Sequence, residues 1–240
     1  MTRSGPGLVL LHALPFNGGM WAGQMSLLPE QTYAPNLYEF GDDIQIWAEQ
    51  CLAQIKQDKF IIVGCSVGGS CAIEIARLVP ERVTALVLIG TKARRDPDPN
   101  FFQDTLIMLE TKNIDTMWQT YWRDLFDGVS DEEDVQFAER LALRQNQNLL
   151  RNGLTAFHTR PSREQVLCDW KFPIHIVTGE HDKLPGIQYS QNLAHNAKNA
   201  TLHIVKSAGH YLPMTHVAEI NAIIENCITN ASIDDFLPPD

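Results

Sequence analysis

The sequence predicts an α/β protein with one reduced parallel sheet of about six strands, helices on both faces and a helical cap inserted between two strands. Short apolar runs recur along the chain, and their nearly continuous apolar character is typical of strands buried on both faces. Each run is followed by glycine or polar residues and then by a helical pattern, the alternation that gives right-handed crossovers in a parallel sheet. This rhythm stops between residues 92 and 167, which predicts the cap.

Six apolar segments predict the strands. The weakest lies within residues 32–41 and ends near Pro35. The other five are "LVLLH" (8–12), "FIIVG" (60–64), "VTALVLIG" (83–90), "IHIVTG" (174–179) and "TLHIV" (201–205). Between them, helical apolar spacing predicts helices over 44–57, 67–79, 187–197 and 216–230.

The cap is predicted to lie over one edge of a core formed by residues 1–91 and 168–240. Helical patterns in it cover 101–111, 114–126 and 131–151, and Ser130 with Glu133 has the spacing of a capping box for the last of these. The cap also has more large apolar side chains than short helices need. They form either the core of the cap or the lining of an apolar pocket, and the candidates for the pocket are Met108, Trp118, Trp122 and Phe126.

Composition narrows the class of protein. The formal net charge of −10 argues against nucleic acid or an anionic membrane surface as the main partner. No run approaches the roughly 18 apolar residues of a membrane helix, and "LVLLHALPF" near the start lacks the features of a signal peptide. The five cysteines are odd in number and form no CxxC pair, which indicates reduced thiols. We expect a cytoplasmic protein, either a monomer or a small homo-oligomer.

A G-x-S-x-G pentad surrounds Ser66. Residues 64–68 read "GCSVG", directly after an apolar strand and directly before a helix. A nucleophile on a strand–helix turn needs small neighbours, and the helix N-terminus aims free N–H groups at a developing oxyanion. The pentad alone is a weak signal, because a glycine turn joining strand to helix has the same letters.

A serine hydroxyl needs a base, and the base needs an orienting acid. Asp182 follows one later strand and His210 follows the next. The order serine, acid, histidine is the one that this chemistry takes in α/β-hydrolases, and all three residues lie at carboxyl ends of predicted parallel strands. Glu180 is the competing candidate for the acid.

With these residues the chain resembles the α/β-hydrolase superfamily, and within it the small capped esterases and lactonases related to pimeloyl-carrier-protein methyl esterase and 3-oxoadipate enol-lactonase. The resemblance implies that Ser66 is the nucleophile, His210 the general base and then acid, and Asp182 the orienting acid. "HALP" (12–15) resembles the family's oxyanion loop, which implies oxyanion donors at the backbone N–H groups of Leu14 and Val67.

The chain also departs from the family pattern. Ala13 stands where the family usually has glycine, and Asn36 and Glu39 replace an aspartate and a glycine after the next strand. The strand at residue 8 aligns with the family's third, which is why we expect a reduced sheet.

Other reactive residue types have simpler interpretations. His12 ends the first strand, where a structural hydrogen bond is the expected role, and Cys65 is expected to pack as a small apolar residue. The remaining histidines lack metal-site spacing, and no Gly-rich dinucleotide or phosphate loop is present, so we expect neither a metal nor a cofactor.

These observations predict a serine hydrolase that cleaves a carboxylic ester or lactone of a small, apolar substrate through an acyl-enzyme. Two alternatives remain open at this stage. The same triad can serve C–C bond or thioester hydrolysis, since fold does not fix function. A non-catalytic binding protein that has kept the hydrolase shell is the other.

Overall fold

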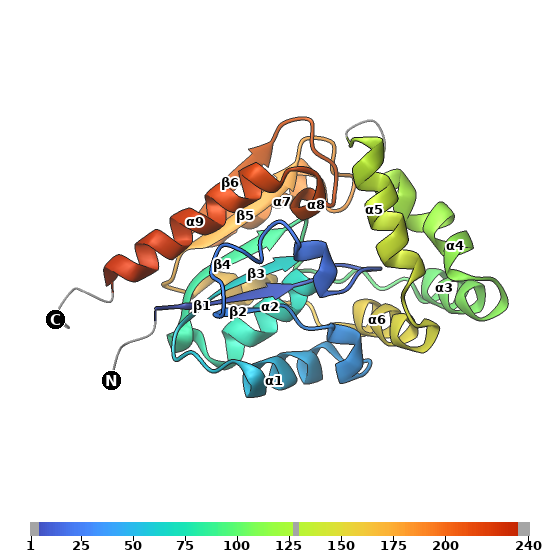
Figure 1. Cartoon of the computed structure of the whole chain (residues 1–240). Helices are drawn as coiled ribbons and strands as arrows, with labels where there is room; N and C mark the ends of the chain where they lie inside the picture. Colours follow the sequence, from blue (N-terminus) through green and yellow to red (C-terminus); the bar gives the residue numbers. More distant parts are fainter. Residues whose placement is uncertain (1–4, 127–129, 235–240) are drawn as a thin grey trace.

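The computed structural model describes residues 5–126 and 130–234, and its centre is a six-stranded sheet in which every neighbouring pair is parallel (Figure 1). The strand order is β2-β1-β3-β4-β5-β6, which confirms the predicted sheet. The strands are β1 (Gly7–Leu11), β2 (Thr32–Tyr33), β3 (Phe60–Cys65), β4 (Val83–Ile89), β5 (Ile174–Gly179) and β6 (Ala200–Val205).

The strand order places the carboxyl end of β3 beside a reversal in the direction in which strands are added to the sheet. After β2 the chain crosses to the other side of β1 and forms β3, so the direction of strand addition reverses between β1 and β3. Every residue of β1 and β3 is buried, as their continuous apolar character requires. Ligands of open α/β sheets bind at the carboxyl ends of strands beside such a reversal, which is where β3 ends.

Helices cover both faces of the sheet. Helices α1 (Ile44–Gln54) and α2 (Val67–Leu78) lie on one face, and α9 (Val217–Asp234) lies on the other (Figure 1). Helix α7 (Ile187–Asn196) packs against β5 and β6, and the short α8 (Leu212–Thr215) precedes α9. Short 3₁₀ helices occupy Gly18–Trp21, Leu37–Phe40, Pro80–Arg82, Arg123–Leu125 and Glu164–Cys168. None of the described helices combines the length and the apolar character needed to cross a membrane.

Between β4 and β5 the described chain is helical, as the sequence predicts, but the helices divide differently. Helix α3 (Pro99–Thr111) is followed by α4 (Ile114–Met117), which continues into a π-helical turn over Trp118–Trp122. The single helix predicted over 131–151 is wrong: it is two helices, α5 (Glu132–Leu143) and α6 (Gln147–Thr159).

Side-chain capping explains where α6 begins, whereas α5 has no side-chain cap. Asn146 Oδ1 accepts hydrogen bonds from the backbone N–H groups of Asn148 and Leu149, so α6 begins there with a residue that favours this position. The predicted capping box is also wrong. The residue before the first turn of α5 is Asp131, and the buried Ser130 hydroxyl has no partner among the described residues.

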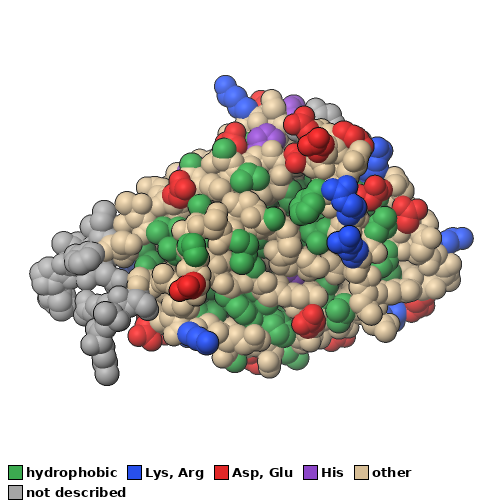
Figure 2. All heavy atoms as spheres, viewed as in Figure 1, with side chains coloured by type: hydrophobic (Ala, Val, Ile, Leu, Met, Phe, Trp, Pro, Cys, Tyr) green, Lys and Arg blue, Asp and Glu red, His purple; other side chains and the backbone are tan. Residues whose placement is uncertain are grey.

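Several hydrogen bonds attach the cap segment to the core, and two of them involve buried or partly buried side chains. Arg163 Nε donates to Glu74 Oε1 of α2 at 2.6 Å, and this glutamate is only 1% exposed. On the other side, Asn152 Nδ2 of α6 donates to the carbonyl of Tyr38 at 3.0 Å. On the face that Figure 2 shows, acidic and basic side chains alternate over the cap end of the molecule.

Candidate active site

Ser66 lies on a strained turn between β3 and α2. Its φ of 53° and ψ of −117° place a residue with a side chain in a region that L-residues rarely adopt. Such strain costs of order 1–3 kcal/mol and is found mainly at functional sites. The Ser66 N–H donates to the carbonyl of Ile89 at 2.8 Å, which fixes the turn to the neighbouring strand. A plain glycine turn would place the positive φ on a glycine, whereas here the serine adopts it.

The neighbouring glycines are required by close approaches of the backbone. A Cβ atom on Gly64 would lie 2.5 Å from the carbonyl oxygen of Gly68. A Cβ atom on Gly68 would lie 2.2 Å from the carbonyl oxygen of Leu11 on β1. Both distances are too short for any side chain, so these two positions require glycine. The glycines allow β1, β3 and the start of α2 to pack closely around the turn that carries Ser66.

The structure joins Asp182 and His210 by a hydrogen bond. His210 Nδ1 lies 3.0 Å from Asp182 Oδ1, and the two residues are 3% and 6% exposed. Asp182 Oδ1 also accepts from the N–H of Leu184 at 2.7 Å. Gly90 passes close beneath: a Cβ atom there would lie 2.9 Å from the His210 ring and 3.1 Å from Asp182 Oδ2. The two loops after β5 and β6 therefore form one packed unit with the end of β4.

Glu180 has a different role from Asp182. Its carboxylate accepts the backbone N–H of Ser207 at 3.0 Å, and its side chain is 46% exposed. Glu180 holds the turn after β6 through Ser207, and His210 lies three residues after that serine. No hydrogen bond links Glu180 to His210.

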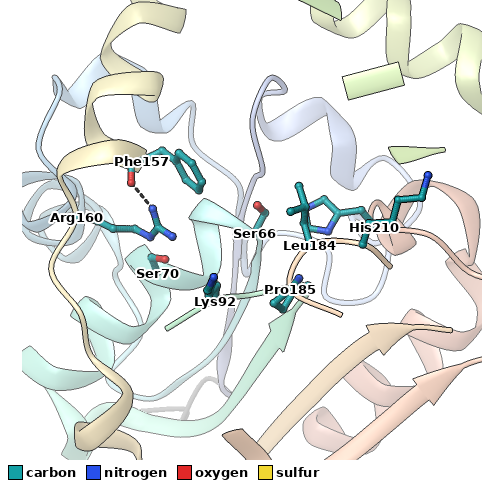
Figure 3. A pocket seen from close by; sticks show the side chains of 10 residues that line it. Ser66, Ser70, Lys92, Phe157, Arg160, Leu184, Pro185 and His210 are labelled. Carbon is teal, nitrogen blue, oxygen red and sulfur yellow. Dashed lines mark hydrogen bonds between the residues drawn. The ribbon is translucent and has the colours of Figure 1, made fainter. Parts of the chain in front are cut away.

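Ser66 and His210 line the same cavity, which has two hollows. The first, which we call the aromatic hollow, has a volume of about 240 Å³ and includes Phe101, Tyr121, Trp122, Phe157, His158 and Tyr211. The second, which we call the cationic hollow, has a volume of about 160 Å³ and includes Ser70, Lys92, Arg160, Lys183 and Pro185. Ser66, Phe157, Leu184 and His210 line both hollows, so the serine stands where they meet (Figure 3).

The loop after β1 is held from its carbonyl side. The Tyr211 hydroxyl donates to the carbonyl of Leu14 at 2.9 Å, and the Tyr38 hydroxyl donates to the carbonyl of Ala13 at 3.3 Å. Among the described residues, the N–H groups of Leu14 and Val67 donate to no protein acceptor. Leu14 also lines the cavity beside Ser66, whereas the side chain of Val67 is fully buried and Val67 is not among the residues that line either hollow.

His12 supports this loop as a neutral side chain. Its Nε2 accepts the N–H of Leu37 at 2.9 Å, so the proton is on Nδ1, which donates to the carbonyl of Ala13 at 3.2 Å. Burial lowers the pKa of His12 to about 4. These contacts are the structural hydrogen bonds expected at the end of the first strand.

The cap candidates separate into two groups. Trp122 lines the aromatic hollow, whereas Trp118, Phe126 and Met108 are not among its lining residues. Trp118 is fully buried against Phe126, with ring centroids 5.8 Å apart, and Met108 packs against the core.

Two other aromatic lining residues, Phe157 and His158, were not predicted from the sequence. Phe157 and His158 belong to α6, which continues eight residues past the predicted helix end at residue 151. The signal that could have found them is the apolar spacing of Leu150, Leu154 and Phe157, which continues one face of that helix beyond the predicted end.

Cysteines and metal ligands offer no second centre in the part of the chain that the structure describes. Cys65 is fully buried, and its burial raises the pKa of the thiol well above the usual value, which makes it a packing residue. No group of three or more histidine, cysteine or acidic side chains could hold a metal ion among residues 5–126 and 130–234.

Comparison with known proteins supports the fold and a hydrolase activity. A family model described as alpha/beta hydrolase fold matches residues 6–217. Among curated proteins, the chain is 26% identical over 238 residues to the pimeloyl-[acyl-carrier protein] methyl ester esterase of Pseudoalteromonas atlantica, covering 90% of this chain and 92% of that one. It is 23% identical over 258 residues to the 2-hydroxymuconate semialdehyde hydrolase of a Pseudomonas species, covering 93% and 87%.

Solved structures agree with the family match. A thermophilic esterase from Thermogutta terrifontis superposes with a TM-score of 0.82 at 19% identity, covering 96% of this chain and 92% of that one. The enol-lactonase from Burkholderia xenovorans superposes with a TM-score of 0.81 at 17% identity, covering 94% and 92%. These likenesses confirm the predicted fold, and the resemblance to esterases and lactonases agrees with the named relatives.

Proposed function

Because the chain belongs to the α/β-hydrolase fold family, we propose that it is a serine hydrolase that cleaves a carboxylic ester or lactone of a small substrate. The observation that carries the proposal is the strained Ser66, in a cavity that it shares with a histidine bonded to a buried aspartate. The named relatives support the choice of bond, because one is a methyl ester esterase and one structural neighbour is an enol-lactonase.

The first half of the reaction uses His210 as a base. The hydrogen bond to Asp182 keeps the proton of the neutral ring on Nδ1, so that Nε2 is free to accept the proton of the Ser66 hydroxyl. The serine oxygen then attacks the carbonyl carbon. The resulting imidazolium is stabilised by the Asp182 carboxylate, which stays ionised.

The oxyanion of the tetrahedral intermediate is bound by backbone N–H groups. The N–H groups of Leu14 and Val67, which have no acceptor among the described residues, are the proposed donors, and the N-terminus of α2 adds its positive dipole end. His210 next gives its proton to the leaving alcohol. Water, activated by the same histidine, then releases the acid from Ser66, and the proposed route uses no cofactor.

Labelling of the serine tests the assignment. A fluorophosphonate should label the wild-type protein but not Ser66→Ala. The rate at which Ser66→Ala hydrolyses a 4-nitrophenyl ester should be lower than that of the wild type by more than about 1,000-fold. Ser232→Ala, which removes a hydroxyl on α9, is the matched control and should label normally. Labelling of Ser66→Ala at the wild-type rate would overturn the proposal.

A C–C bond hydrolase is the second candidate. The observation that favours it is the similarity to 2-hydroxymuconate semialdehyde hydrolase, which matches nearly the whole chain. The same three residues would serve, but the proton would go to carbon instead of oxygen. A panel of esters, lactones and vinylogous diketones compared by kcat/KM decides between the two.

A further inference from the structure

Arg160 is a buried cation without an acidic partner. It follows the last residue of α6 and is 6% exposed. Its guanidinium donates to the carbonyl of Phe157 and lies over the Phe157 ring, 4.1 Å from the centroid. No acidic side chain of the described residues forms an ion pair with it.

Burying a charged group without a partner of opposite charge costs free energy of folding, so charged side chains in proteins are normally either paired or exposed to solvent. Burial and the nearby Arg95 lower the pKa of Arg160 only to about 10, so the group stays charged at neutral pH. The nearby acid Asp96 is already bound by Lys92 at 2.5 Å and by Arg94 at 2.9 Å. Among the described residues, Arg160 is therefore left without a carboxylate partner.

The surroundings of Arg160 favour an anion. Lys92 and Lys183 also line the cationic hollow, and none of the described acidic residues does. Ser70, one helical turn after Ser66 on α2, adds a hydroxyl without a protein partner among the described residues. In a protein with a net charge of −10, this hollow is a local exception. Figure 3 shows the Arg160 guanidinium extending toward Ser70, on the opposite side of Ser66 from His210.

We propose that the substrate carries a carboxylate on one side of the scissile bond, bound by Arg160 in the cationic hollow, and an apolar group on the other side, held in the aromatic hollow. The planar guanidinium matches a carboxylate with two parallel hydrogen bonds. Because Ser66 lies where the hollows meet, a molecule that fills both places its middle at the serine. This inference rests on the proposed hydrolase function and narrows its substrate class.

The test compares matched charged and neutral substrates. Monobenzyl esters of straight-chain dicarboxylic acids, from succinic to pimelic acid, are measured beside the benzyl esters of the corresponding ω-carboxamide acids. A second set, ω-carboxyalkyl phenylacetates and their carboxamides, places the charge on the alcohol side. Released alcohol is quantified by chromatography.

For at least one chain length and orientation, the wild-type kcat/KM for the carboxylate should exceed that for the carboxamide by about 10- to 100-fold, chiefly through KM. In Arg160→Gln this ratio should fall to near one, and Arg160→Lys should keep part of it. Because both substrates are measured on one sample, the ratio does not depend on the fraction of folded enzyme. Arg144→Gln, an exposed cap arginine, is the control and should keep the wild-type ratio.

Two results overturn the inference: a wild-type ratio near one in every set, or a ratio that Arg160→Gln leaves unchanged. If instead no ester is cleaved, the proposed function fails and binding decides the carboxylate site separately. Calorimetry on Ser66→Ala should then show tighter binding of the carboxylates than of the carboxamides, and adding Arg160→Gln should remove the difference. Equal binding of both sets would overturn the inference by this route.

Discussion

The hydroxyl of Tyr211 offers a direct test of how the loop after β1 is positioned. Tyr211→Phe removes the 2.9 Å hydrogen bond to the carbonyl of Leu14 and leaves the ring in place, packed 4.8 Å from Phe16 and from Phe126 between centroids. The residue is 2% exposed, so the carbonyl loses a partner that water replaces poorly. A buried acceptor left unpaired costs about 1–3 kcal/mol of unfolding free energy.

The effect on rate follows from the same bond. With the carbonyl released, the adjoining peptide that carries the Leu14 N–H can rotate away from the oxyanion. We expect kcat to fall about 10-fold, short of the 100-fold or more that follows the complete loss of an oxyanion donor. KM and the pH profile should change little, because His210 and Asp182 are untouched.

The assay measures kcat, KM and urea unfolding of Tyr211→Phe together. Tyr33→Phe is the matched control, since it removes a buried tyrosine hydroxyl that has no partner among the described residues. It should change neither stability nor rate appreciably. If Tyr211→Phe lost stability but kept the wild-type kcat, the hydrogen bond would support the fold without positioning a donor, and the reasoning would be refuted.

Three further outcomes follow from the geometry of the site. Asp182→Asn should lower kcat by about 10,000-fold because the wrong tautomer of His210 is favoured. Glu180→Gln should keep most of the activity. Equal losses of kcat in the two variants, measured by steady-state kinetics, would contradict the assignment of the acid. Gly69→Ala places a Cβ atom 1.8 Å from Thr91 Oγ1. The midpoint of thermal unfolding of this variant should therefore fall by several degrees. An unchanged midpoint in calorimetry would mean that the start of α2 moves without a cost in stability. His12 has a folded-state pKa of about 4 against 6.5 for the free side chain, so its contribution to the free energy of unfolding is complete above pH 6.5. That contribution is lost as the pH falls toward 4, at about 1.4 kcal/mol per pH unit. Urea unfolding from pH 7 to 4.5 should show a shallower loss of stability in His12→Gln than in the wild type, and parallel curves would exclude this histidine as the cause.

The sheet and the order of the three proposed catalytic residues were accessible from sequence because they depend on local patterns. Strands buried on both faces are continuously apolar, and side chains that follow parallel strands meet at one edge. The positive φ at Ser66 and the close approaches around Gly64 and Gly68 explain why small residues surround the serine.

The cap was less accessible because its details depend on small local choices. Residues 144–146 are polar but include no glycine or proline that would end a helix, so the capping side chain of Asn146 marks the break between α5 and α6. Trp118 and Trp122 are four residues apart, which on a regular helix places two side chains on one face. The π-helical turn between them is wider, and one ring enters the core while the other lines the cavity. The role proposed for Arg160 depends on its tertiary burial, which has no signature in the sequence.

Tyr38 links two parts of the molecule that are far apart in sequence. Its hydroxyl holds Ala13, its carbonyl accepts from Asn152 of α6, and a Cβ atom on Gly153 would lie 2.5 Å from its ring. Any change that moves α6 to admit a larger substrate therefore also shifts the tyrosine that holds the loop beside Ser66. We expect substrate range and turnover to vary together in this protein. Directed evolution toward bulkier substrates should then accumulate compensating changes around Tyr38 before it recovers rate.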